Sequence, residues 1–215
     1  MGLFAVIPAR GGSKRIPRKN IKLFLGKPII AYSIEVAVTS KLFEKVIVST
    51  DDDEIAGIAE EYGAEVPFNR PAELSNDHIG NTKVIAHSVN WMQQQEWEVD
   101  TVCCIYATAP FIQSNDLHTA YNIFQSNKWD FVFAATDYVY PIQRSFRLLK
   151  NGSVNMMFPE NYTKRSQDLE IFCHDAGQFY WGKPESWIEN RIIFSEKSTV
   201  VNIQPYRAMD IDTEE

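Results

Sequence analysis

The chain has 215 residues, of which 45% are hydrophobic and 23% are charged, and its formal net charge is −7 at pH 7. This length suits one α/β domain with a sizeable core, and the acidic balance excludes general nucleic-acid binding because no large positive face can be built from it. No apolar run approaches membrane-spanning length and no signal peptide precedes the first strand, so we expect a cytoplasmic protein without a membrane partner. Cys103, Cys104 and Cys173 match neither a disulfide framework nor a zinc motif.

The first two-thirds of the chain alternates short β-rich runs with helical patterns, which predicts parallel strands joined by crossover helices. The predicted strands cover about 3–8, 46–50, 64–68, 101–106 and 131–135. One predicted helix begins at Pro28 and has an inward apolar stripe that reaches Val38. A second begins after the acidic run 51–54, and two more begin at about 82 and 114. The last two of these helices extend to about 95 and 127. The acidic run could be a metal site, but a helix cap with an acidic first turn is the simpler interpretation.

The pattern changes between about 138 and 178, where the apolar rhythm breaks into short aromatic and basic pieces. This predicts an inserted hairpin or arm, and because such an arm needs a partner surface we expect a homodimer. The alternation then resumes with a strand at 179–181, a short helix at 184–189 and a strand at 199–203. We therefore expect a single domain over 1–215 that carries this arm.

A cluster of cations follows the first strand, where the sequence from Arg10 to Asn20 reads RGGSKRIPRKN. Charge-assisted donors beside an adjacent glycine pair indicate a site for a polyanion such as a triphosphate. The alternative is a solvated basic loop with a turn-forming glycine pair. Neither a G-x-x-x-x-G-K-[ST] loop nor a G-x-G-x-x-G fingerprint is present, so the phosphates would be held by a long loop and its side chains, and an oxidoreductase is disfavoured.

Two carboxylates near the end of the chain, Asp210 and Asp212, flank Ile211. Alternate residues of an extended segment point the same way, so both carboxylates would lie on one side and suit a hard divalent ion such as Mg²⁺. The alternative is an acidic chain end, because Glu214 and Glu215 follow at once.

The run IPARGGSKR at 7–15, followed by Lys19 and Asn20, resembles the signature of the cytidylyltransferases that activate nonulosonic acids, the family of the CMP-sialic acid synthetases. The resemblance covers essentially the whole chain, and its first forty residues are most similar to the pseudaminic acid cytidylyltransferase branch. It continues through the segments GKP at 26–28, VSTD at 48–51, RPAEL at 70–74, TAP at 108–110 and DID at 210–212.

The resemblance implies a Rossmann-like α/β nucleotidyltransferase fold, with a mostly parallel sheet, helices on both faces and an inserted dimerisation arm. It also implies a Mg²⁺-dependent reaction in which CTP and a nine-carbon acid sugar give the CMP-sugar and pyrophosphate. The anomeric hydroxyl of the sugar would attack the α-phosphorus of CTP in line. The alternatives are a CMP-sialic acid, CMP-legionaminic acid or CMP-KDO synthetase, or, in another class, a nucleotide-binding dimer without catalysis.

Carried over residue by residue, the resemblance implies catalytic roles for Arg10 and Lys19, which would stabilise phosphate charge, and for Asp210 and Asp212 as the metal ligands. The implied nucleotide contacts are Ala9, Arg10, Gly11, Gly12, Ser13, Lys19, Asn20, Arg70 and Asn81. The implied sugar contacts are Tyr106, Gln143, Arg144, Arg165, Gln167 and Phe179. Tyr106 stands where sialic acid enzymes commonly have glutamine, which favours a sugar with other substituents. An alternative for Arg165 is a solvated arm residue, and no general base stands out.

Overall fold

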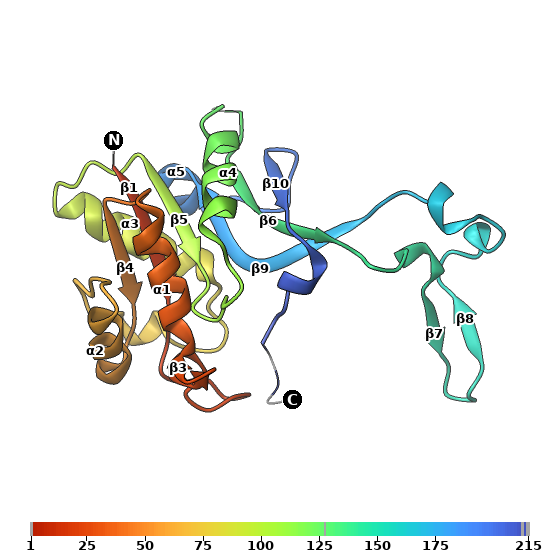
Figure 1. Ribbon diagram of the computed structural model, residues 1–215, viewed down its shortest axis with the longest axis horizontal. Helices are drawn as coiled ribbons and strands as arrows, with labels where there is room; N and C mark the ends of the chain where they lie inside the picture. The colour runs from red at the N-terminus through yellow and green to blue at the C-terminus, as the bar shows by residue number, and fades with distance from the viewer. Residues whose placement is uncertain (1, 127, 212, 214–215) are drawn as a thin grey trace.

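The computed structural model describes residues 2–126, 128–211 and 213, and its centre is a six-stranded sheet (Figure 1). The strands are β1 (Leu3–Pro8), β4 (Lys45–Ser49), β5 (Thr101–Ile105), β6 (Phe131–Asp137), β9 (Cys173–Gly182) and β10 (Ser198–Asn202). Their order across the sheet is β10-β6-β9-β5-β1-β4, and of these six described strands β9 alone runs antiparallel to both of its neighbours. The predicted α/β class with a mostly parallel sheet is confirmed.

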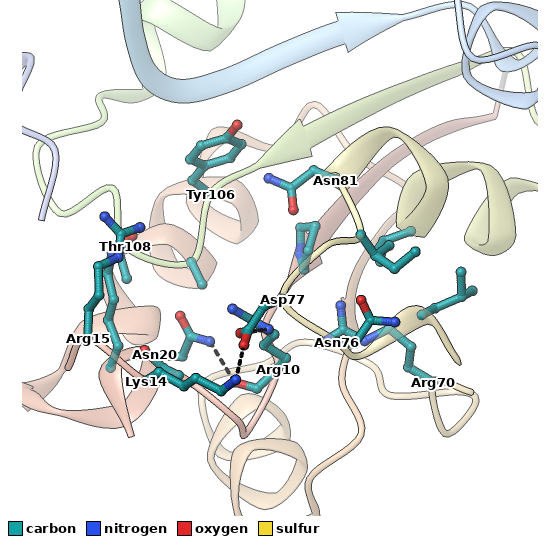
Figure 2. A pocket seen from close by; sticks show the side chains of 17 residues that line it. Arg10, Lys14, Arg15, Asn20, Arg70, Asn76, Asp77, Asn81, Tyr106 and Thr108 are labelled. Atoms are coloured by element: carbon teal, nitrogen blue, oxygen red, sulfur yellow. Dashed lines mark hydrogen bonds and ion pairs between the residues drawn. The ribbon is translucent and has the colours of Figure 1, made fainter. Parts of the chain in front are cut away.

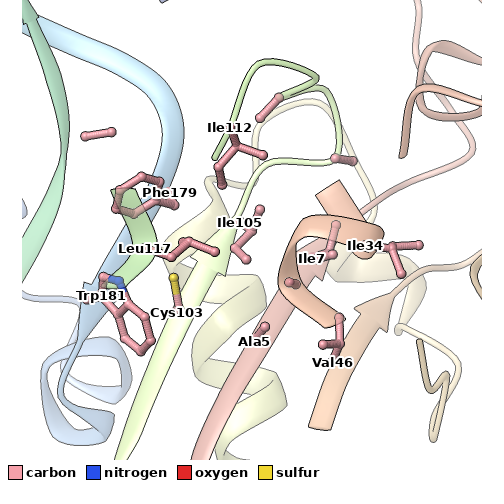
Figure 3. Packing of buried hydrophobic residues seen from close by; sticks show 14 of the residues in the cluster. Ala5, Ile7, Ile34, Val46, Cys103, Ile105, Ile112, Leu117, Phe179 and Trp181 are labelled. Atoms are coloured by element: carbon pink, nitrogen blue, oxygen red, sulfur yellow. The ribbon is translucent and has the colours of Figure 1, made fainter. Parts of the chain in front are cut away.

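Alternate residues of β1 enter two separate cores, as the two-residue period of a strand requires. Leu3, Ala5 and Ile7 face one core, and Phe4 and Val6 face the other. The first core is covered by helices α1 (Ile29–Ser40), α2 (Asp53–Glu61) and α4 (Ser114–Phe124), and part of it is shown in Figure 3. The second is covered by α3 (Asn81–Gln94) and α5 (Pro184–Ile188). Helices therefore lie on both faces of the sheet.

Asp52 caps α2, because its carboxylate accepts a hydrogen bond from the backbone N–H of Ile55 at 3.0 Å. The capping interpretation of the acidic run is thus confirmed. The predicted strand at 64–68 is wrong: this segment makes a single bridge, Ile47 to Glu65, and another single bridge, Thr50 to Asn69, follows it. Pro67 lies between them and has no N–H to donate to a ladder.

Two helix details also differ from the expectation. Val38 was predicted to face inward but is 41% exposed, and Ser40 is the buried residue at that end of α1. The helix predicted from about 114 to about 127 ends at Phe124, and Gln113 is its N-cap residue. Helix termini are set by backbone hydrogen bonds that side-chain preferences predict only within a few residues.

An arm leaves the sheet between β6 and β9 and extends far from the rest of the chain (Figure 1). It contains an antiparallel hairpin of β7 (Phe146–Leu148) and β8 (Val154–Met156). Strand β9 begins at Cys173, so the last residues of the segment 138–178 belong to the sheet. A smaller hairpin of β2 (Leu23–Phe24) and β3 (Lys27–Pro28) precedes α1. Among the helices that the structure describes, none has the length and apolar character needed to cross a membrane.

Candidate active site

A cavity of about 490 Å³ opens beyond the carboxyl ends of β1 and β5, which are neighbours in the sheet (Figure 2). The loop 9–20 continues from β1, and the segment 106–108 continues from β5. The loop 70–80 and the first residue of α3 complete the wall. Ligands of open α/β sheets bind at this edge, so the topology places the predicted basic loop where a substrate is expected.

Five cationic side chains line the cavity, and among the described lining residues Asp77 is the one carboxylate. The cations are Arg10, Lys14, Arg15, Lys19 and Arg70. Asp77 forms ion pairs with Lys14 and with Arg10, the latter at 2.5 Å. Hydrogen bonds from Lys14 and then Arg10 hold the pKa of Asp77 below its usual range, so it remains an anion at neutral pH. The net excess of positive charge suits a polyanionic ligand.

The side chain of Arg70 is buried in this wall without full pairing. The residue is 4% exposed, and its Nη2 lies 3.6 Å from Oδ1 of Asp51, which is too far for a hydrogen bond. Neither Nε nor Nη2 has a hydrogen-bond partner among the described atoms. Burial lowers the pKa of Arg70, yet guanidinium groups stay protonated in proteins. Buried charged donors without acceptors are costly, so this group is suited to receive an anionic or carbonyl oxygen from a ligand.

Internal hydrogen bonds hold the basic loop in place. Asn20 Nδ2 donates to the carbonyl of Arg10 at 3.0 Å, and Gly11 N–H donates to Oδ1 of Asp51 at 3.0 Å. The two terminal nitrogens of Arg18 donate hydrogen bonds to the two carboxylate oxygens of Asp52, at 2.5 and 2.9 Å. A Cβ on Gly11 would lie 2.5 Å from Oδ2 of Asp52. The glycine is therefore explained by close packing against the start of α2, and its N–H faces Asp51 instead of a ligand.

Most of the predicted nucleotide contacts meet at the cavity, together with one predicted sugar contact. These lining residues are Arg10, Ser13, Lys19, Asn20, Arg70, Asn81 and Tyr106. Ala9 is instead fully buried in the core, and Gly11 and Gly12 are not part of the lining. Asn76, Asp77 and Thr108 line the cavity but were not among the predicted residues. Thr108 belongs to the segment TAP at 108–110, which is part of the family resemblance. No sequence pattern indicated Asp77, which reaches the cavity through the path of the loop 70–80.

The other predicted sugar contacts do not lie at the cavity of their own chain. Gln143, Arg144, Arg165 and Gln167 belong to the arm. Gln143 is buried there and donates to the carbonyl of Glu170 at 2.8 Å, and Arg165 pairs with Asp168. Phe179 has no exposed surface and packs in the first core, so a direct sugar contact by its ring is excluded in this structure.

Of the predicted metal ligands, Asp210 is exposed and Asp212 lies outside the described residues. The segment just before Asp210 is anchored beside the cavity. Gln178 Nε2 donates to the carbonyl of Arg207 at 2.7 Å, and the carbonyl of Gln178 accepts from the N–H of Tyr106 at 2.8 Å. Within the described part of the chain, no three His, Cys, Asp or Glu residues form a metal-binding group.

The sequence profile of a family described as cytidylyltransferase matches residues 4–207. The chain belongs to this family. Pseudaminic acid cytidylyltransferase of Campylobacter jejuni strain 81-176 is 48% identical to it, over 97% of this chain and 90% of that protein. CMP-N,N'-diacetyllegionaminic acid synthase of Legionella pneumophila is 32% identical, over 99% of this chain and 92% of that protein. The family resemblance stated from the opening signature is confirmed.

Two solved structures share the fold of this chain. A CMP:2-keto-3-deoxy-manno-octonic acid synthetase complexed with CTP superposes with a TM-score of 0.68 at 18% identity, covering 99% of this chain and 94% of that one. A 4-diphosphocytidyl-2C-methyl-D-erythritol synthase from Anaerococcus prevotii gives a TM-score of 0.58 at 14% identity, covering 99% and 93%. At these identities the likeness concerns the fold, and it confirms the predicted nucleotidyltransferase architecture.

Proposed function

We propose that this cytidylyltransferase converts CTP and pseudaminic acid to the CMP-sugar and pyrophosphate. The single observation that carries the reaction is the cation-lined cavity with the buried Arg70, two of whose nitrogens have no hydrogen-bond partner among the described atoms, in a chain that belongs to the cytidylyltransferase family. The 48% identity to a pseudaminic acid cytidylyltransferase supports this sugar over legionaminic acid, because the corresponding synthase is 32% identical.

The cavity offers what nucleotidyl transfer needs, which is positioning and charge stabilisation more than covalent chemistry. We assign Arg10 and Lys19 to the phosphate groups, where they stabilise the charge that builds up as the anomeric oxygen attacks the α-phosphorus. Arg70, with its free N–H groups, binds an oxygen of the nucleotide. The described residues at the cavity supply no clear general base, and none is assigned.

Asp210 and Asp212 are proposed as the carboxylates that hold Mg²⁺. The exposure of Asp210, and the anchoring of its segment next to Tyr106, fit a cation that is shared with substrate oxygens. When bound, Mg²⁺ would polarise the α-phosphoryl group and lower the pKa of the attacking hydroxyl.

The arm supports a homodimer. Exposed apolar side chains are concentrated on it, with exposures of 62% for Phe146, 75% for Leu148 and 74% for Ile171. Apolar surface of this kind marks an interface, and a second copy of the chain is the partner we propose. In such a dimer Arg165 and Gln167 of one chain are available to the sugar site of the other.

Light scattering should therefore give the mass of two chains. Leu148→Asp, which places a charge on this apolar surface, should shift the mass toward one chain. Lys150→Glu is the control, because Lys150 is close to Leu148 in the sequence but already carries a charge. A wild-type mass of one chain at micromolar concentration would contradict the dimer.

Pyrophosphate release tests the proposed reaction. CTP and Mg²⁺ are supplied with pseudaminic, N-acetylneuraminic or legionaminic acid in parallel, and we expect release with pseudaminic acid that stops when Mg²⁺ is omitted. Release with only one of the other acids would support the proposed reaction but contradict pseudaminic acid as the substrate. CTP binding without release in all three would favour the non-catalytic alternative.

Asp77→Asn should lower the KM for CTP about two- to fivefold, because Asp77 competes with the triphosphate for Arg10 and Lys14 and surface ion pairs are of this strength. Steady-state kinetics with varied CTP measures this change. Asp130→Asn is the matched control, since Asp130 also pairs with two cations, Lys183 and Arg191, away from the cavity. A higher KM for Asp77→Asn would show that Asp77 positions the cations instead of competing for them.

A further inference from the structure

Gln178 lies in an irregular stretch of β9. On β6, Phe133 pairs with Tyr180 and Ala135 pairs with Asp175, so two steps along β6 correspond to five along β9. The additional residues form a β-bulge, in which part of the strand leaves the regular ladder. Gln178 belongs to this bulge, so its polar groups are available for contacts other than the ladder with β6.

The backbone and the side chain of Gln178 bind two different segments beside the cavity. Its backbone carbonyl accepts a hydrogen bond at 2.8 Å from the N–H of Tyr106, which lines the cavity. Its side-chain Nε2 donates a hydrogen bond at 2.7 Å to the carbonyl of Arg207. Arg207 is three residues before Asp210, the first of the two proposed metal ligands. One residue therefore connects the cavity wall to the segment that carries these carboxylates.

The side-chain amide of Gln178 is not explained by the stability of the core. The residue is 3% exposed, and its Oε1 has no hydrogen-bond partner among the described atoms. A buried amide oxygen without a donor is unfavourable, and an apolar side chain of similar size would avoid this cost. The hydrogen bond to the carbonyl of Arg207 is what the amide provides in return.

Two contacts hold Arg207, and they act on different parts of the residue. Its side chain pairs with Asp116 on α4 at 2.5 Å, which fixes the end of a long and flexible side chain. The hydrogen bond from Gln178 instead fixes the backbone of Arg207 itself. Because Asp210 follows along that backbone, the contact with Gln178 has the more direct effect on where its carboxylate lies.

We infer that Gln178 is a positioning residue, which holds the backbone before Asp210 against the cavity wall so that the proposed metal carboxylates face the substrates. It acts through Arg207 and touches neither substrate nor metal. A misplacement of about 1 Å in a catalytic site can lower the rate about 100-fold, so one such contact has a measurable effect. The inference rests on the proposed function, since it takes Asp210 and Asp212 as metal ligands.

Gln178→Met tests the inference, because methionine has a similar size and no amide. Hydrogen exchange, measured without substrate or metal, should become about fivefold faster at the N–H groups of Arg207 and Ala208, which donate to the carbonyls of Gln204 and Pro205. The kcat should fall about tenfold and the half-saturating Mg²⁺ concentration should rise, while the KM for CTP at saturating Mg²⁺ stays unchanged. The urea midpoint should also stay unchanged, since the unpartnered oxygen is removed together with the hydrogen bond.

Thr136→Val is the matched control, because it removes a buried hydrogen bond to the same segment of the chain. Thr136 Oγ1 donates at 2.8 Å to the carbonyl of Ile203, four residues before Arg207. The N–H of Ile203 stays bonded to the carbonyl of Ala135, so the backbone remains held there. This variant should leave the exchange at Arg207, the kcat and the Mg²⁺ dependence unchanged.

Unchanged exchange at Arg207 in Gln178→Met would overturn the inference, and so would faster exchange without a loss of kcat. A urea midpoint that falls in proportion to kcat, or an equal rise in the KM for CTP, would make Gln178 a structural residue and would overturn it as well. A wild-type enzyme that releases pyrophosphate with none of the acids would instead overturn the proposed function, and the inference with it.

Discussion

Replacing Arg70 with methionine should lower kcat/KM for CTP about 100-fold or more without destabilising the protein. The guanidinium is buried, its nearest carboxylate lies 3.6 Å away, and two of its nitrogens have no partner among the described atoms. Its burial therefore costs free energy in the absence of ligand, and an apolar side chain of similar length removes that cost. Steady-state kinetics and urea unfolding of the same preparations measure both effects.

Arg70→Lys separates charge from geometry. Lysine keeps the positive charge but lacks the planar fork of donors, so it should recover only part of the lost activity. Arg191→Met is the control for the substitution itself, because Arg191 pairs with Glu189 and Asp130 away from the cavity and should leave kcat/KM unchanged. If Arg70→Met lowered the urea midpoint in proportion to its loss of activity, Arg70 would be a structural residue and not a ligand of the nucleotide.

The parts of the fold that the sequence predicted are those set by local periodicity. The apolar run of β1 contributes side chains to both cores, and the acidic run after β4 caps α2 through Asp52. Both features were predictable because each depends on residues that are close in the chain. The loop residues Arg10, Lys19 and Asn20 were predicted for the same reason, since one contiguous motif carries them to the end of one strand.

The errors arise where a side chain is placed by distant parts of the chain. Phe179 was predicted at the sugar site, but both faces of β9 are covered by a core. Phe179 packs in the first core and is buried, and Tyr180 packs in the second core beside Tyr106. Alternation alone cannot show this, because it separates the two faces of a strand but does not show which layers of the fold cover them. Asp77 was missed for a similar reason, as only the folded loop brings it to Arg10.

Arg207 provides the opposite case to Arg70, because its charge is fully paired. It contacts Asp116 on α4 through two nitrogens, at 2.5 and 3.2 Å, and the two side chains are 12% and 9% exposed. The hydrogen bond with Asp116 raises the pKa of Arg207. This pair fastens the segment that follows β10 to the domain, and the carbonyl of Arg207 adds the hydrogen bond from Gln178.

Arg207→Met should therefore lower the free energy of unfolding by about 3 kcal/mol, because it leaves Asp116 buried without a partner. The double variant Asp116→Leu/Arg207→Met removes both charges and should regain most of that loss, which urea unfolding can measure. At a temperature where Arg207→Met is folded, the loosened segment before Asp210 should reduce kcat more than it raises the KM for CTP. A stability unchanged by Arg207→Met would show that the pair does not hold this segment. These two arginines thus give opposite results: removing Arg70 costs activity, whereas removing Arg207 costs stability first.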